Sequence, residues 1–92
     1  MYTLIYTNRM KRDVKLIKKR GKDIKKLAEV IDILLKGESL PDKNKDHQLQ
    51  GEWQGFRECH IEPDWLFIYR IEEQELILFA TATGSHSDLF GK

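Results

Sequence analysis

Apolar residues recur along the first third of the chain with the period of a helix. The clearest stripe has the spacing of one helix face and comprises Ile24, Leu27, Ala28, Ile31, Leu34 and Leu35. A shorter stripe of Met10, Val14 and Ile17 predicts an earlier helix. Gly21 and Gly37 stand where the two helices should end, because glycine accepts the left-handed conformation. The pattern predicts two consecutive helices that form a hairpin.

Four other segments have the composition or the period of strands. Residues 2–6 are rich in β-branched and aromatic side chains. Residues 56–62 alternate, and residues 65–71 and 76–83 are nearly continuous apolar runs, as expected for central strands buried on both faces. The order β-α-α-β-β-β predicts an α+β fold, with the helical hairpin packed on a largely antiparallel four-stranded sheet. We expect one domain over residues 1–92.

Alternation along residues 56–62 assigns the side chains to two faces of one strand. One face carries Phe56, Glu58, His60 and Glu62, and the other carries Arg57, Cys59 and Ile61. The preceding loop, residues 38–55, contains His47 and is longer than most connections, and such loops are often functional. After the last strand, Ser85 and Asp88 form a capping-box pattern that starts a helical turn. His86 would lie at its N-terminus, where free N–H groups favour an anion.

Composition is that of a soluble globular protein, with 40% hydrophobic and 34% charged residues. No apolar run approaches the roughly 20 residues that span a bilayer, so we expect no membrane association. The N-terminus lacks the pattern of a signal peptide. The single cysteine, Cys59, has no partner for an internal disulfide. Together these features predict a reduced, cytoplasmic setting.

The net charge of +1 conceals a strong asymmetry along the chain. Residues 9–26 contain ten Lys or Arg and two Asp, a charge of +8, and the remainder contains six basic and thirteen acidic residues, a charge of −7. Such a division suggests a basic surface for a polyanion or an acidic partner. The alternative interpretation is an ordinary solvated helix surface.

Three histidines and one aspartate are candidates for chemistry: His47, His60, His86 and Asp64. A zinc site is not favoured, because the histidines are 13 and 26 residues apart and lack the close ligand pairs common in zinc sites. A nucleophilic triad is not favoured either, because Cys59 alternates to the face opposite His60. We therefore expect neither a metal nor another cofactor.

The remaining hypothesis is metal-free cleavage of RNA. This reaction needs a base for the ribose 2′-OH, a cation near the phosphorane and an acid for the leaving 5′-oxygen. Histidine, with an ordinary pKa of about 6.5, serves both proton-transfer roles, and Arg57 or Arg70 would supply the cation. Taken alone, His60 is more often a structural histidine and Asp64 more often a turn residue. The hypothesis depends on all four residues together, with the basic helix nearby.

Three separated blocks of sequence, in order, carry a resemblance to a known family. They are Lys45-Asp46-His47 with Leu49, Gly51 and Trp53, then Arg57-x-x-His60-Ile61-Glu62-Pro63-Asp64-Trp65, then Thr83-Gly84-Ser85-His86 with Leu89-Phe90. The whole chain resembles bacterial type II toxins of the RelE superfamily, in the YafQ branch. The resemblance implies a ribosome-dependent endoribonuclease that enters the ribosomal A site and cleaves mRNA. It also implies a cognate antitoxin that holds the toxin inactive.

The resemblance also implies roles for individual residues. His47 and His86 would transfer protons, Asp64 would assist or orient one of them, and His60 would contact or polarise the phosphate. The expected substrate-binding residues are Phe90, which would stack on a base, with Arg57, Arg70 and Trp65. The expected contacts to ribosomal RNA phosphates are Lys11, Arg12, Lys15, Lys18, Lys19, Lys22 and Lys26. One position departs from the branch, because an arginine common four residues before the last histidine is Ala82 here.

That departure keeps a second hypothesis open. A non-catalytic protein of the same fold would use the basic helices and a sheet edge to bind an antitoxin-like acidic partner or RNA.

Overall fold

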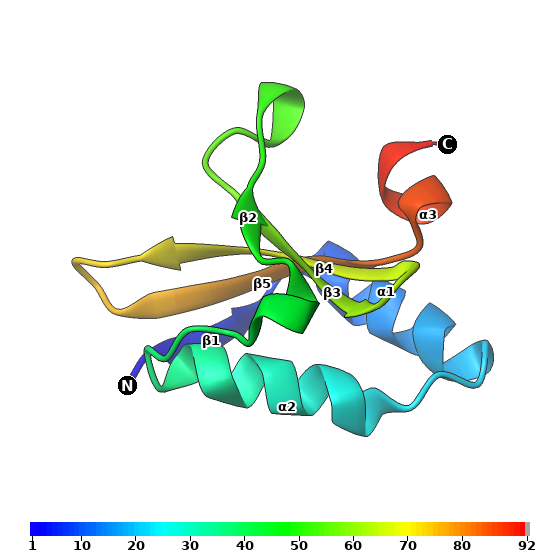
Figure 1. Cartoon of the computed structure of the whole chain (residues 1–92), viewed down its shortest axis with the longest axis horizontal. Coiled ribbons are helices and arrows are strands. Elements are labelled where there is room, and N and C mark those ends of the chain that lie inside the picture. Colours follow the sequence, from blue (N-terminus) through cyan, green and yellow to red (C-terminus); the bar gives the residue numbers. More distant parts are fainter. Residues whose placement is uncertain (92) are drawn as a thin grey trace.

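The computed structural model describes residues 1–91, so Lys92, the last residue of the expected domain, lies outside the described residues. Its strands and α-helices follow one another in a mixed order (Figure 1). They are β1 (Thr3–Tyr6), α1 (Asn8–Lys19), α2 (Ile24–Leu35), β2 (His47–Gln48), β3 (Arg57–Glu62), β4 (Trp65–Glu72), β5 (Ile77–Gly84) and α3 (His86–Phe90). Two short 3-10 turns, Asp42–Asn44 and Gly51–Trp53, flank β2.

The strands form one sheet in the order β1-β5-β4-β3-β2. β1 runs parallel to β5, and the other neighbours are antiparallel. The α+β class and the largely antiparallel sheet are therefore confirmed. The expectation of four strands was wrong by one, because His47 and Gln48 pair with Glu58 and Arg57 as a fifth strand. Two residues are too few to show a period in the sequence.

Short-range signals in the sequence set the helix ends. The Thr7 hydroxyl accepts from the Met10 N–H at 3.0 Å, and the Asp23 carboxylate accepts from the Lys25 N–H at 3.0 Å, so both helices begin at a capping side chain. α1 ends before Gly21, which has a φ of +80°. These contacts are local, which is why the sequence alone placed both helices.

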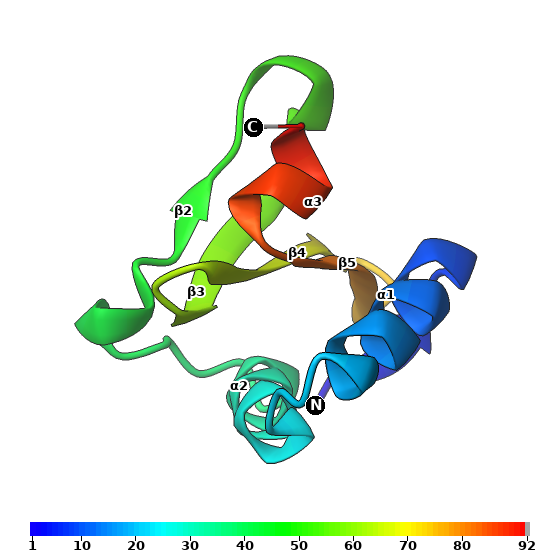
Figure 2. The ribbon, with the colours of Figure 1, turned by 90° about the vertical axis from the view of Figure 1, so that its right-hand side faces the viewer.

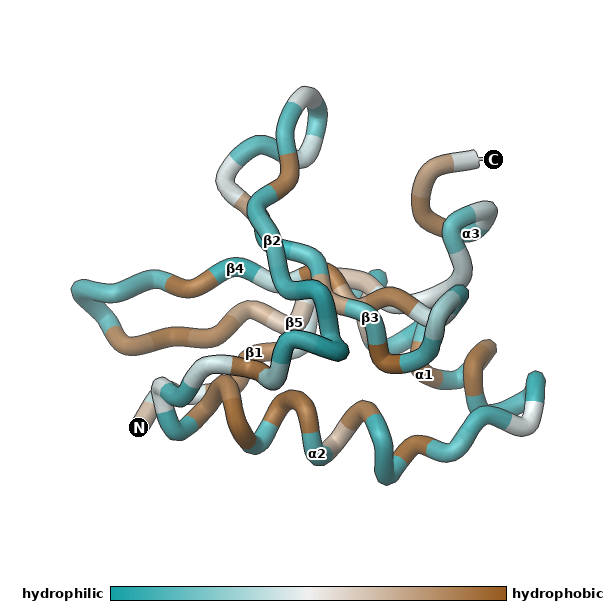
Figure 3. The backbone as a smooth tube through the Cα atoms, viewed as in Figure 1, coloured by the Kyte–Doolittle hydropathy of each residue, from teal (hydrophilic) through white to brown (hydrophobic). Residues whose placement is uncertain are grey.

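The larger part of the core lies between the α1–α2 hairpin and one face of the sheet (Figures 1 and 2). Along the helices in Figure 3, brown hydrophobic stretches alternate with teal hydrophilic ones, and the hydrophobic side chains enter this core. The central strands contribute every second residue. This helix-side cluster consists of Met10, Ile17, Leu27, Val30, Ile31, Leu34, Cys59, Trp65, Phe67, Tyr69, Leu78 and Ala80. Burial raises the pKa of the Cys59 thiol far above its ordinary value, so this cysteine is not a nucleophile.

A smaller cluster covers the opposite face of the sheet, where α3 and the β2 segment rise above the strands (Figure 2). Leu66, Ile68, Ala82 and Leu89 are its buried members. This face carries the candidate site. Within residues 1–91, no helix is long and apolar enough to cross a membrane.

A β-bulge changes the predicted alternation at the end of β3. The register with β4 shifts between His60 and Glu62. Glu62 was expected on the face of His60, but it pairs instead with Lys22 and Lys26 of the helical layer, at 2.9 and 2.8 Å. The extra residue turns the Glu62 side chain away from His60, so Glu62 is not part of the histidine cluster.

Candidate active site

Five polar side chains from four separate segments meet on the α3 side of the sheet. Glu58 and His60 come from β3, His47 from β2, Asp64 from the β3–β4 turn and His86 from the start of α3. The rings of His60 and His86 are 5.9 Å apart between centroids, although 26 residues separate them in the chain. The cluster therefore contains all three histidines and the aspartate that the sequence singled out.

Asp64 holds His86 in two ways. Its Oδ1 accepts from the backbone N–H of His86 at 2.9 Å and lies 2.6 Å from the ring Nδ1. These two contacts, the backbone one first, lower the pKa of Asp64 below its ordinary value of 3.8. The carboxylate is therefore ionised at neutral pH and accepts a hydrogen bond from the Nδ1–H of His86. The Nε2 of His86 remains for other partners.

The helix that carries His86 is itself anchored to α1. The Ser85 hydroxyl and the Asp88 carboxylate form the predicted capping box. Arg20 binds the same carboxylate, with Nη2 at 3.1 Å from Oδ1. These partners, Arg20 first, hold the pKa of Asp88 far below its ordinary range. α3 thus has an ionic attachment to the basic helix.

Glu58 is the member of the cluster to which the sequence assigned no role. Its carboxylate Oε1 lies 3.6 Å from His47 Nε2 and 3.6 Å from His60 Nε2. Glu58 is only 4% exposed, which is unusual for a carboxylate without a functional or structural purpose. The alternation of β3 placed Glu58 beside His60. The pairing of β2 with β3, which brings His47 opposite Glu58, was not visible in the sequence.

The long loop reaches the site because Asp46 ties it to the sheet. The Tyr69 hydroxyl donates to Asp46 Oδ1 at 2.6 Å, and Arg57 Nη2 donates to Asp46 Oδ2 at 3.1 Å. The next residue, His47, has its Nδ1 2.8 Å from the Lys45 carbonyl oxygen. The backbone next to His47 is therefore held by the contacts of Asp46, and the imidazole is oriented by the contact of its Nδ1 with the Lys45 carbonyl oxygen.

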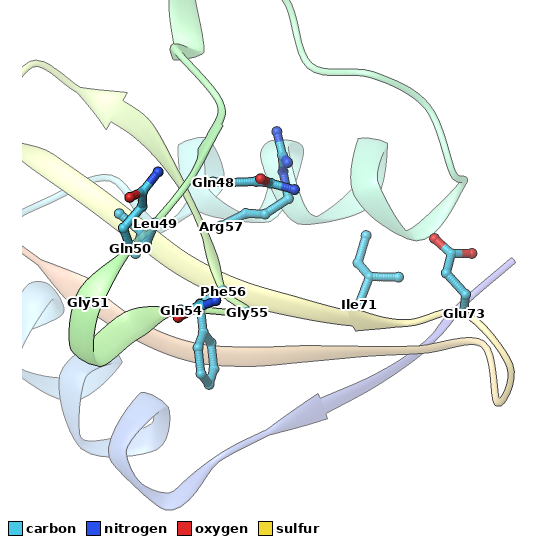
Figure 4. Close-up of a pocket in the computed structure, with 10 residues that line it drawn as sticks. All are labelled: Gln48, Leu49, Gln50, Gly51, Gln54, Gly55, Phe56, Arg57, Ile71 and Glu73. Atoms are coloured by element: carbon cyan, nitrogen blue, oxygen red, sulfur yellow. The ribbon is translucent and has the colours of Figure 1, made fainter.

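Three expected substrate-binding residues do not join the histidines. Trp65 is 0% exposed in the helix-side cluster, where its indole N–H donates to Thr83 Oγ1 at 2.9 Å, so the expectation that it contacts substrate is wrong. Arg57 points away from the histidine face to Asp46, opposite to Phe56 in Figure 4. Arg70 stacks on Phe79 at 4.3 Å. Neither arginine is placed to act as the phosphate cation.

Two positions at the C-terminal end of the site, Phe90 and Ala82, take part in packing. Phe90 is partly buried and packs against the smaller cluster. Ala82, where the family arginine was expected, is 0% exposed beneath α3. This position therefore supplies packing and no charge.

Within residues 1–91, no group of three His, Cys, Asp or Glu side chains is arranged to hold a metal ion. The basic residues of α1 are exposed except for the half-buried Arg9. Lys22 and Lys26 form ion pairs with Glu62.

Known proteins match this chain over nearly its whole length. The family model described as "Bacterial toxin of type II toxin-antitoxin system, YafQ" matches residues 2–91. The mRNA interferase toxin YafQ of Escherichia coli K12 is 42% identical over 87 residues, which cover 94% of this chain and 92% of that protein.

Two solved structures have the same fold. The toxin in the E. coli DinJ-YafQ toxin-antitoxin complex has a TM-score of 0.88 and 41% identity, over 98% of each chain. A metal-bound toxin from Helicobacter pylori has a TM-score of 0.92 and 42% identity, over 98% of this chain and 100% of that one. The chain belongs to the YafQ family of bacterial toxins from type II toxin–antitoxin systems.

Proposed function

We propose that this toxin is an endoribonuclease that cleaves mRNA in the ribosomal A site by proton transfer between histidines and RNA. The observation that carries the proposal is the meeting of His47, His60 and His86 with Asp64 and Glu58 on one face of the sheet. The relative from E. coli K12 is named an mRNA interferase, which agrees with this chemistry.

The reaction begins when one histidine removes the proton of a ribose 2′-OH. The 2′-oxygen attacks the adjacent phosphorus, and the bond to the 5′-oxygen of the next nucleotide breaks as a second histidine protonates that oxygen. The products are a 2′,3′-cyclic phosphate and a free 5′-OH, so atoms and protons balance. Because one imidazole takes a proton from the RNA and another gives one to it, this reaction needs no metal ion.

His86 is suited to proton transfer at Nε2, because Asp64 occupies its Nδ1. We assign the second proton transfer to His47, which is exposed and faces Glu58 through Nε2. His60 lies between them, 5.9 Å from His86 between ring centroids, and would contact the phosphate. Glu58 would orient His47 and His60 together, since its carboxylate lies at the same distance from both.

The exposed basic residues of α1 would bind ribosomal RNA phosphates in the cytoplasm. Displacement of counterions from RNA makes such binding weaken steeply with salt. A cognate antitoxin would hold the toxin inactive, as the E. coli relative was crystallised in a toxin–antitoxin complex.

The proposal is tested by inducing the protein in cells and mapping new 5′ ends on mRNA. Wild type should produce cuts within translated codons, and His47→Ala, His60→Ala, Asp64→Ala and His86→Ala should each reduce them. Ribosome binding, measured by cosedimentation, should survive these substitutions. A wild-type protein that binds ribosomes and leaves mRNA intact would support a non-catalytic binding protein instead.

A further inference from the structure

A small hollow opens beside His60, at the edge of β3 that β2 leaves uncovered. Its volume is about 320 Å³, and Lys43, Asn44 and Lys45 form one wall while residues 60–63 form the other. Pockets for small ligands begin at about 300 Å³, so the hollow suits one nucleotide unit and not a folded RNA element. His60 belongs both to this hollow and to the histidine cluster.

The hollow is positively charged. Lys43 and Lys45 are exposed, and neither forms an ion pair with another residue in the 1–91 range. The only carboxylate in its lining, Glu62, is already bound by Lys22 and Lys26. Because Glu62 is paired with two lysines from outside the hollow, Lys43 and Lys45 are the cations that the lining offers to a ligand.

The lysine-bearing wall is fixed to both histidines beside it. Asn44 is 7% exposed, and its Nδ2 donates to the backbone carbonyl of His60 at 2.8 Å. Lys45 has a left-handed φ of 50°, and its carbonyl oxygen lies 2.8 Å from Nδ1 of His47. The wall that carries Lys43 and Lys45 is thus held in a fixed position relative to His47 and His60.

A second, larger hollow lacks the free lysines and the histidine that line the small one. It has a volume of about 660 Å³ and is lined by Gln48, Gln50 and Gln54, with no lysine (Figure 4). Its one cation, Arg57, is paired with Asp46. It contains no histidine. The smaller hollow is therefore the one suited to an anion near the cleavage site.

We propose that the hollow between Lys43, Lys45 and His60 binds a phosphodiester of the mRNA that adjoins the one being cut. This subsite rests on the proposed function. It supplies cationic contacts that Arg57 and Arg70 do not provide, and that position 82 cannot provide because it is an alanine. Lysine ammonium groups bind phosphate as point charges. Binding the neighbouring phosphate positions the scissile phosphate against the histidines. Loss of this contact should therefore lower the affinity for substrate before it affects the chemical step.

The test compares Lys43→Gln/Lys45→Gln with Lys25→Gln/Lys36→Gln, which removes the same charge from exposed positions outside the hollow and the proposed RNA-binding face. Single-turnover cleavage of mRNA on programmed ribosomes is measured against toxin concentration and salt. We expect the half-saturating concentration to rise about tenfold for the first double variant only. The slope of log affinity against log salt should fall by about 0.7 for each phosphate that the variant no longer neutralises.

A second measurement identifies the phosphate. A neutral methylphosphonate is placed one linkage to the 5′ side, or one to the 3′ side, of the cut. At one of these two positions it should weaken binding of wild type about tenfold and leave the Lys43/Lys45 variant unaffected. Melting temperatures of all variants should agree, because the four lysines are exposed.

Three results would overturn the inference. If the two double variants have equal affinity and salt slope, the subsite does not exist, although the proposed function stands. If the lysine variant loses affinity but neither methylphosphonate affects wild type, the lysines bind another RNA. If wild type leaves the mRNA uncut, the proposed function fails and the subsite with it.

Discussion

The substitution Tyr69→Phe tests whether one buried contact holds the long loop in place. Tyr69 is 1% exposed, and its hydroxyl donates to Asp46 at 2.6 Å. Burial, and then Asp46 itself, raise the pKa of Tyr69 above its ordinary value of 10.0, so the hydroxyl keeps its proton and acts as donor. The substitution removes this one oxygen and leaves the ring in place.

The expected loss of stability follows from the type of hydrogen bond. A hydrogen bond to a charged acceptor contributes about 1.5–3 kcal/mol. Asp46 keeps Arg57 as a partner and is partly open to water, so we expect the lower value, about 1.5 kcal/mol. For a domain of this size, 1 kcal/mol changes the Tm by roughly 4–8 °C, so the Tm should fall by roughly 6–12 °C.

Denaturant unfolding at pH 7 measures the change directly. Tyr6→Phe is the matched control, because the Tyr6 hydroxyl forms no hydrogen bond within residues 1–91. Its unfolding free energy should change by less than about 0.5 kcal/mol. Cleavage by Tyr69→Phe should also slow well below its Tm, since Asp46, next to His47, loses one of the two side chains that bind it to the sheet.

Two results would refute this reasoning. One is an equal loss of stability in Tyr69→Phe and Tyr6→Phe. The other is an undiminished cost of Tyr69→Phe when Asp46→Ala is already present, because two residues in contact should show a coupling energy of about 0.5–3 kcal/mol.

Three further predictions concern other buried or paired groups. Because the folded-state pKa of Asp88 is lowered, its stabilising effect is fully present above the ordinary pKa of 3.8 and is lost only as the pH falls through the lower folded-state pKa. Asp88→Asn should therefore lower the Tm at pH 7, and its difference from wild type should shrink progressively as the pH falls below 3.8, whereas Asp32→Asn, in an exposed pair, should change little at any pH. Glu58→Gln should slow single-turnover cleavage at least about tenfold without unfolding the protein, since its carboxylate lies 3.6 Å from both imidazoles and is placed to orient them, and a tenfold change in rate corresponds to about 1.4 kcal/mol; an unchanged rate would remove Glu58 from the site. Thr83→Val leaves the indole N–H of Trp65 buried without an acceptor and should cost about 1–3 kcal/mol in urea unfolding, and a neutral result would show that the indole finds another acceptor.

The sequence by itself determined the features that depend on neighbouring residues. Helical spacing located α1 and α2, and Gly21 and Gly37 marked where they end. Alternation along β3 put Cys59 in the core and His60 on the opposite face. Such signals act over one turn or one strand, so they can be read without the fold.

The resemblance to YafQ-like toxins directed attention to residues far apart in the chain. It assigned roles to His47, His60, Asp64 and His86, which residue chemistry had already made candidates, and these four lie in one cluster. It did not reveal Glu58, which became part of the cluster only because β2 pairs with β3.

Tertiary structure decided everything that depends on pairing between distant segments. β2 is two residues long and exists because Asp46 is bound by Tyr69 and Arg57 from other strands. The bulge after His60 turned Glu62 to the helical layer, where two lysines neutralise it. A period in the sequence cannot report a shift in register or a contact across the sheet, because both arise from partners that are distant in the chain. The apolar run of residues 65–71 predicted burial of Trp65, whereas the resemblance implied contact with substrate, and the fold decided between the two by placing Trp65 in the core.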